Sequence, residues 1–118
     1  MLTIDNLNEN KVLTVSAKGK ITKGDYDIIL PQMEKLLEKH GKLRFLINLE
    51  DIESVEPEAA WEDLKFDRKH MDEYGKIAIV GEKNWEKWGT KISSLFFDPE
   101  MKFFYKDQKE MAKAWVNN

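Results

Sequence analysis

The sequence predicts an α/β domain with a mixed, mainly parallel sheet, an antiparallel hairpin at its N-terminal edge and four helices. Strands alternate with helical segments after residue 22, and residues 43–49 and 76–80 are apolar enough to be strands buried on both faces. Because a parallel pair needs a long crossover, this alternation indicates a parallel sheet with helices on its faces. At 118 residues the chain has the usual length of one domain, so we expect a single unit spanning 1–118.

The beginning of the chain predicts the hairpin. Residues 2–4 and 12–17 alternate between apolar and polar side chains on either side of a turn at 8–10. Gly19 and Thr22 are expected to end this piece of the chain.

A long helix is expected next. Thr22 and Asp25 have the spacing of a capping box, and Gly41 is typical of the position just after a helix. Pro31 falls on the polar side of this helix. One face carries the apolar side chains Tyr26, Ile29, Leu30, Met33, Leu36 and Leu37, followed by His40.

The second half of the chain predicts three more helices and three strands. The elements before the last helix are a strand at 43–49, an acidic loop at 50–56, a helix from Pro57 to Met71 or Glu73, a strand at 76–80, a helix after Asn84 and a strand at 101–105. The last helix is expected to use Asp107 and Glu110 as caps. Its inward side chains are expected to be Met111, Ala114 and Trp115.

Composition excludes several classes of protein. The 19 basic and 22 acidic residues give a net charge of -3, and the basic residues are scattered singly, so no nucleic-acid partner is expected. No apolar stretch approaches the roughly 18 residues of a membrane span, so no integral membrane segment is expected. The N-terminus lacks signal-peptide features and cysteine is absent, which favours a cytoplasmic location.

Several short motifs carry a family resemblance. They are Leu30-Pro31, Asn48-Leu49, Ala60-Trp61-Glu62-Asp63, Ile77-Ala78-Ile79-Val80-Gly81, Trp85 with Trp88, and Ala112-Lys113-Ala114-Trp115. Together with the order of elements, they resemble the SpoIIAA-like family of small stand-alone STAS-type domains of bacteria. The resemblance implies a sandwich-like α/β domain related in fold to CRAL-TRIO lipid carriers. Together with the absence of catalytic motifs, it favours a binding or regulatory module without enzymatic activity.

The same resemblance bears on regulation by phosphorylation. In regulatory STAS domains an Asp-Ser-Ser-Gly motif precedes the second helix, and phosphorylation of its second serine switches partner binding. The resemblance places Glu56-Pro57-Glu58-Ala59 at that motif, so both serines are absent. A glutamate carries about one negative charge, whereas a phosphoserine carries about two. We therefore expect a fixed acidic surface here and not a switch.

The main functional hypothesis is a binding or regulatory module that acts through the loop Glu50–Glu58 and the helix after it. The expected partner is a protein or a second copy of the chain, giving a homodimer. No nucleophile constellation, glycine-rich phosphate loop or zinc motif is present, so neither catalysis nor a cofactor is expected. The expected partner-binding residues are Asn48, Glu50, Asp51, Ser54, Glu56 and Glu58.

Two alternatives use other residues. A small apolar, lipid-like ligand would bind in an aromatic pocket bordered by Trp61, Phe66, Trp85 and Phe96. A divalent metal would use Asp63, Asp67 and His70, which share one side of the second helix, but a solvated flank with ion pairs explains this spacing better, so no metal is expected.

Overall fold

The computed structural model describes residues 1–56, 65, 74–81 and 101–118. Its five described strands form one sheet in the order β1-β2-β3-β4-β5. The strands are β1 (Leu2–Leu7), β2 (Val12–Ile21), β3 (Leu43–Val55), β4 (Tyr74–Gly81) and β5 (Met101–Tyr105). β1 runs antiparallel to β2, and every other neighbouring pair is parallel. The prediction of a mixed, mainly parallel sheet with an N-terminal antiparallel hairpin is confirmed.

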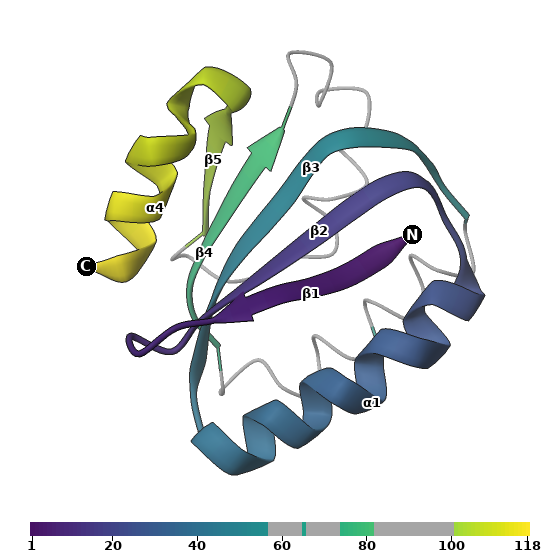
Figure 1. Cartoon of the computed structure of the whole chain (residues 1–118), viewed down its shortest axis with the longest axis horizontal. Coiled ribbons are helices and arrows are strands. Elements are labelled where there is room, and N and C mark those ends of the chain that lie inside the picture. The colour runs from purple at the N-terminus through teal and green to yellow at the C-terminus, as the bar shows by residue number, and fades with distance from the viewer. Residues whose placement is uncertain (57–64, 66–73, 82–100) are drawn as a thin grey trace.

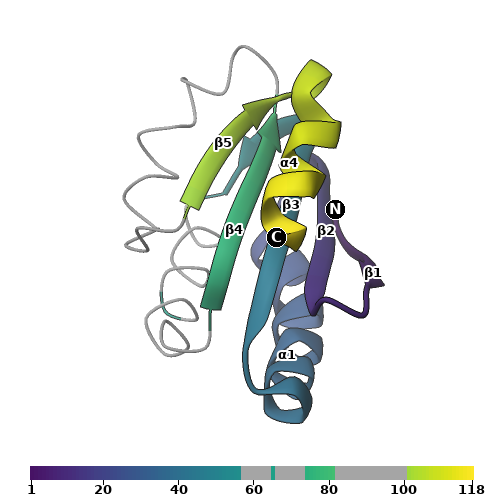
Figure 2. The same ribbon diagram turned by 90° about the vertical axis from the view of Figure 1, so that its left-hand side faces the viewer.

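Two α-helices lie within the described residues, on opposite faces of the sheet (Figures 1 and 2). They are α1 (Lys23–His40) and α4 (Lys109–Asn117), and the 3-10 helix η3 (Lys106–Gln108) precedes α4. The expected helices after Pro57 and after Asn84 lie outside the described residues, so two of the four expected helices are seen.

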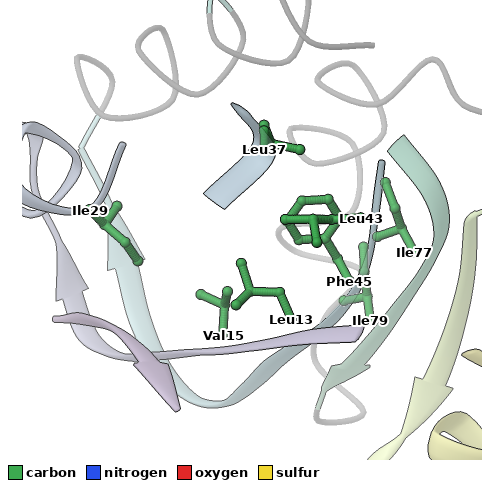
Figure 3. Packing of buried hydrophobic residues seen from close by; sticks show 8 residues of the cluster. All are labelled: Leu13, Val15, Ile29, Leu37, Leu43, Phe45, Ile77 and Ile79. Carbon is green, nitrogen blue, oxygen red and sulfur yellow. The ribbon is translucent and has the colours of Figure 1, made fainter. Parts of the chain in front are cut away.

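Side-chain alternation along the strands explains why each face has its own core. Leu13 and Val15 of β2 point to the α1 face, whereas Val12 points to the α4 face. The α1-side core consists of Leu13, Val15, Ile29, Leu37, Leu43, Phe45, Ile77 and Ile79 (Figure 3). The α4-side core consists of Val12, Leu46, Ala78, Val80, Phe104, Ala112 and Val116.

Local signals set both ends of α1, as the sequence predicts. The backbone N–H of Asp25 donates to Thr22 Oγ1 at 3.2 Å, and the backbone N–H of Thr22 donates to Asp25 Oδ2 at 2.8 Å, which completes the capping box. The Thr22 backbone bond lowers the pKa of the Asp25 carboxyl below its ordinary value, because it stabilises the ionised form. At the other end Gly41 has a φ of +80°, and its N–H donates to Leu37 O.

β2 and β3 both run further than predicted. Gly19 does not end β2; it has a φ of +62° at a register shift, and the strand continues to Ile21. Lys18 to Ile21 pair with residues 51–55, so the predicted loop at 50–55 is wrong and these residues are part of β3. The physical reason is burial: Ala17 and Ile21 form a small core covered by Leu49 and Ile52, which stabilises the longer pairing.

The last helix also differs from its prediction. Asp107 lies in η3, and α4 begins after Gln108, which makes no side-chain cap bond. Ala112 and Val116 are buried and Trp115 is half-buried, whereas Met111 is 60% exposed and Ala114 is exposed. The expected caps and the expected inward positions of Met111 and Ala114 are therefore wrong, because the 3-10 turn delays the helix and changes which side faces the sheet.

Candidate functional site

The acidic end of β3, defined here as residues 50–56, is the predicted binding segment. It continues β3 beyond Asn48, whose Cα pairs with Val80 in the last described pair between β3 and β4. β2 accompanies it as far as the pair of Ile21 with Val55. Among the described strands, β2 is therefore the neighbour of the acidic end.

The described side chains of this segment alternate in exposure. Ile52 packs against the small core of Ala17 and Ile21, Glu53 is exposed, and Ser54 is half-buried. Across the ladder, Lys18 is the Cα partner of Asp51 and Lys20 is that of Ser54. Two lysines of the neighbouring strand are therefore in register with the acidic end.

Glu56 links the acidic end to the start of α1. Its backbone N–H donates to Ile21 O at 2.8 Å. The backbone N–H of Lys23, at the first position of the helix, donates to Glu56 Oε1 at 3.3 Å. A carboxylate at this position interacts favourably with the positive end of the helix dipole. The exposed Glu56 is therefore held in place by the fold.

The predicted partner-binding residues lie along one strand and do not converge on a point. Asn48 is a half-buried position inside the sheet, with Ser16 and Val80 as Cα partners, and not the end of a strand as expected. The distance from Asn48 to Val55 along the strand is roughly 20 Å at the usual rise per residue. Such a line of residues suits contact with an extended partner better than enclosure of a small molecule.

Other predicted site residues lie outside the described residues. They are Glu58, the aromatic set Trp61, Phe66, Trp85 and Phe96, and the metal candidates Asp63, Asp67 and His70. Within the part of the chain that the structure describes, no three carboxylate or imidazole side chains are grouped to hold a metal ion. Neither described α-helix is long and apolar enough to cross a membrane.

A basic pocket at the opposite end of β3 was not predicted. It has a volume of about 300 Å³, and its described lining residues are Asn10, Lys11, Lys42, Arg44, Gly75 and Lys76. In sequence these cations are scattered, but each lies at or near the start of β2, β3 or β4. Parallel strands begin at the same edge of a sheet. The predicted topology could therefore have indicated that these cations lie close together.

Comparisons with known proteins agree with this architecture. A solved structure of an uncharacterised protein of the DUF3478 family with a SpoIIAA-like fold, from Shewanella loihica PV-4, is 30% identical, and the match covers 98% of this chain and 92% of that chain with a TM-score of 0.79. The anti-sigma factor antagonist SpoIIAA, in its unphosphorylated form, has a TM-score of 0.66 over 97% of each chain at 9% identity, which shows likeness of fold alone.

No curated protein matches the sequence significantly. The sequence profile of the family described as SpoIIAA-like matches residues 12–117. That range includes β2 to β5 and both described α-helices. The resemblance carried by the sequence motifs is thus confirmed, and the chain belongs to the SpoIIAA-like family.

Proposed function

We propose that this protein is a non-enzymatic binding or regulatory module that meets a protein partner, or a second copy of itself, through the acidic end of β3 and the segment after it. The observation that supports the proposal is the extension of β3 past its last described pair with β4, from Leu49 to Val55. Extended strands are one of the recurring geometries through which proteins meet peptide segments. Charged side chains along the strand add selectivity for a partner of opposite charge.

The arrangement of side chains supports a permanent surface and not a phosphorylation switch. Glu56 already supplies a negative charge beside the N-terminus of α1, where the Lys23 N–H contacts it. Ser54 is half-buried beside Lys20 of β2, so its hydroxyl is only partly accessible to a modifying enzyme. A fixed carboxylate needs no modifying enzyme and keeps the surface competent at all times.

The class of role comes from the family. SpoIIAA, which shares the fold, is described as an anti-sigma factor antagonist. We extend to this chain only the general role of a regulatory binding module. The apolar-ligand alternative rests on aromatic residues outside the described ones and stays a prediction.

Charge reversal at the acidic end tests this proposal. Glu53→Lys changes an exposed side chain of the acidic end, and Glu38→Lys makes the same change at an exposed position of α1. Self-association is measured by sedimentation equilibrium, and association with other proteins by affinity capture with quantitative mass spectrometry. We expect Glu53→Lys to weaken the association at least tenfold and Glu38→Lys to leave it within twofold.

Glu56→Gln tests whether the charge at this surface, and not its hydrogen bond to α1, is needed for binding. The amide oxygen of glutamine can still accept the Lys23 N–H, so folding should be retained while the charge is lost. If Glu53→Lys and Glu56→Gln both leave every detectable association unchanged, the acidic end is not the binding surface.

A further inference from the structure

The basic pocket introduced above lies where the β1–β2 turn meets the starts of β3 and β4. The turn contributes Asn10 and Lys11, the start of β3 contributes Lys42 and Arg44, and β4 contributes Lys76. Figure 1 shows this turn at the end of the sheet where the C-terminus of α4 also lies. Segments that are distant in sequence thus place four cationic side chains around one hollow.

Gly75 makes room for the basic side chains. It is buried in β4, and a Cβ at this position would lie 3.0 Å from Arg44 Cγ and 3.8 Å from Lys42 Cε. The first distance is shorter than ordinary van der Waals contact, so any larger residue would have to displace the Arg44 side chain. The absence of a side chain at Gly75 therefore lets the stem of Arg44 lie against β4.

Hydrogen bonds to helix ends orient three of the four cations. Arg44 Nη1 donates to Val116 O at 3.1 Å, and Lys76 Nζ donates to Trp115 O at 3.2 Å, both near the C-terminus of α4. Lys11 Nζ donates to His40 O at 3.2 Å, at the C-terminus of α1. These carbonyls carry the partial negative charge of a helix end, so a structural role explains why the cations are present.

The hydrogen bonds to the helix ends use few of the donors that these side chains carry. A guanidinium has five N–H donors and an ammonium has three, whereas within the described residues each of these groups makes one hydrogen bond to a helix carbonyl. Lys42 makes no side-chain hydrogen bond or ion pair with the described residues. Counted over the described part of the chain, the pocket therefore holds more N–H donors than the helix-end carbonyls accept from.

A network of asparagines fixes the turn that closes the pocket. Asn117 Oδ1 in α4 accepts from Asn8 Nδ2 at 2.9 Å and from Asn10 Nδ2 at 3.1 Å. Asn8 Oδ1 accepts from the backbone N–H groups of Asn10 and Val12. Because the turn is held from both sides, Lys11 is presented to the pocket by a defined backbone.

We propose that this basic pocket binds the phosphoryl group of a small soluble ligand. None of its described lining residues is acidic, although the chain as a whole has a net charge of -3. Cations that share a partly buried site repel one another, and a doubly charged anion relieves that repulsion. The planar fork of Arg44 matches two phosphoryl oxygens, and the lysines add point charges. A concave volume of about 300 Å³ suits a small molecule better than a flat membrane surface.

Calorimetric titration with pyrophosphate and with glycerol 3-phosphate tests the proposal at low ionic strength. We expect both ligands to bind the wild-type protein, with an affinity that falls as salt is added. Lys42→Gln should weaken binding about tenfold, and the matched exposed change Lys35→Gln on α1 should leave it within twofold. Gly75→Ala should weaken binding as well, because it crowds Arg44.

Three results would overturn the proposal. The first is no binding of either ligand at millimolar concentration, and the second is equal affinity in Lys42→Gln and wild type while thermal unfolding shows both to be folded. The third is binding only to vesicles that contain phosphatidic acid, which would indicate a membrane surface in place of a small ligand. Glu53→Lys lies at the other end of β3 and should not change phosphoryl binding. The phosphoryl-site proposal and the partner-surface proposal are therefore tested independently.

Discussion

The two ends of β3 carry opposite charges, and they differ in shape as well as in sign. At its start, Lys42 and Arg44 join Lys11 of the β1–β2 turn and Lys76 of β4 around a pocket of about 300 Å³. At its end, the acidic residues follow one another along a single strand. The described cations come from several segments and line one pocket, whereas the residues of the acidic end lie along a single strand. Under our two proposals, the start of β3 would bind a compact anion and its end would meet an extended partner.

The helices explain much of this charge distribution. The basic side chains contact carbonyls at the C-termini of α1 and α4, and Glu56 contacts the first N–H of α1. Each sign of charge therefore lies beside the helix end of opposite partial charge. If the charges served only the helices, removing them would change the free energy of unfolding without changing binding. The following predictions give the changes in stability that we expect.

The largest expected effect is at Arg44. Arg44→Ala removes a charged hydrogen bond to Val116 O and the packing of a half-buried stem against Gly75, so we expect a loss of about 2 kcal/mol in the free energy of unfolding. Urea denaturation measures it. The exposed control Lys35→Ala should change stability by less than about 0.5 kcal/mol. If Arg44→Ala changes the free energy of unfolding by an equally small amount, the basic pocket does not stabilise the packing of α4.

Loss of the α1 cap should have the next largest effect. Thr22→Ala removes the side-chain acceptor of the Asp25 N–H and should cost about 1 kcal/mol. Thr22→Ser keeps the hydroxyl and should retain most of the stability. Urea midpoints for the two variants give the comparison, and equal losses in both would contradict a capping role for the hydroxyl.

The ionised Asp25 carboxylate should give a pH-dependent effect. Its pKa is lowered in the folded protein, so its contribution is fully present above the unfolded pKa and is lost as pH falls through the folded pKa. Asp25→Asn should therefore be less stable than wild type near pH 7, and the difference should narrow as pH falls through the lowered folded pKa. A series of urea midpoints from neutral to acidic pH measures this, and a difference that does not depend on pH would rule out the carboxylate charge as its source.

The smallest expected effect is at Glu56. Glu56→Ala removes a carboxylate from the N-terminus of α1, and an exposed charge at such a site contributes only about 0.3 to 0.5 kcal/mol. Thermal unfolding should show a small decrease that is suppressed by added salt. A loss comparable to that of Arg44→Ala would mean that the acidic end is chiefly structural, which would weaken its role in binding.

Local signals made part of the fold predictable. The capping box of Thr22 and Asp25 and the glycine at residue 41 mark the ends of α1 through contacts within a few residues, and both were identified correctly. The apolar runs of β3 and β4 were also clear, because strands covered on both faces cannot carry many polar residues. The family motifs then gave the correct family.

The other features could not be predicted, because they depend on contacts between residues that are far apart in the sequence. Residues 50–55 are acidic and look like a loop, but their pairing with β2 and the burial of Ile21 make them a strand. The basic pocket was missed because Lys11 and Arg44 are 33 residues apart, Arg44 and Lys76 are 32 residues apart, and the three meet only through the parallel register. The asparagine contacts between the β1–β2 turn and α4 carry no local signal at all.

Those asparagine contacts also have a consequence for the order of folding. Asn8 and Asn117 are 109 residues apart, and Arg44 is 72 residues from the carbonyl that it contacts in α4. Contacts of such long range form slowly, because closing large loops lowers the conformational entropy of the chain. The β1–β2 hairpin can form early, whereas its turn becomes fixed only when α4 docks. Phosphoryl binding would therefore be recovered late in refolding. The time at which binding returns could be used to measure when the native state is complete.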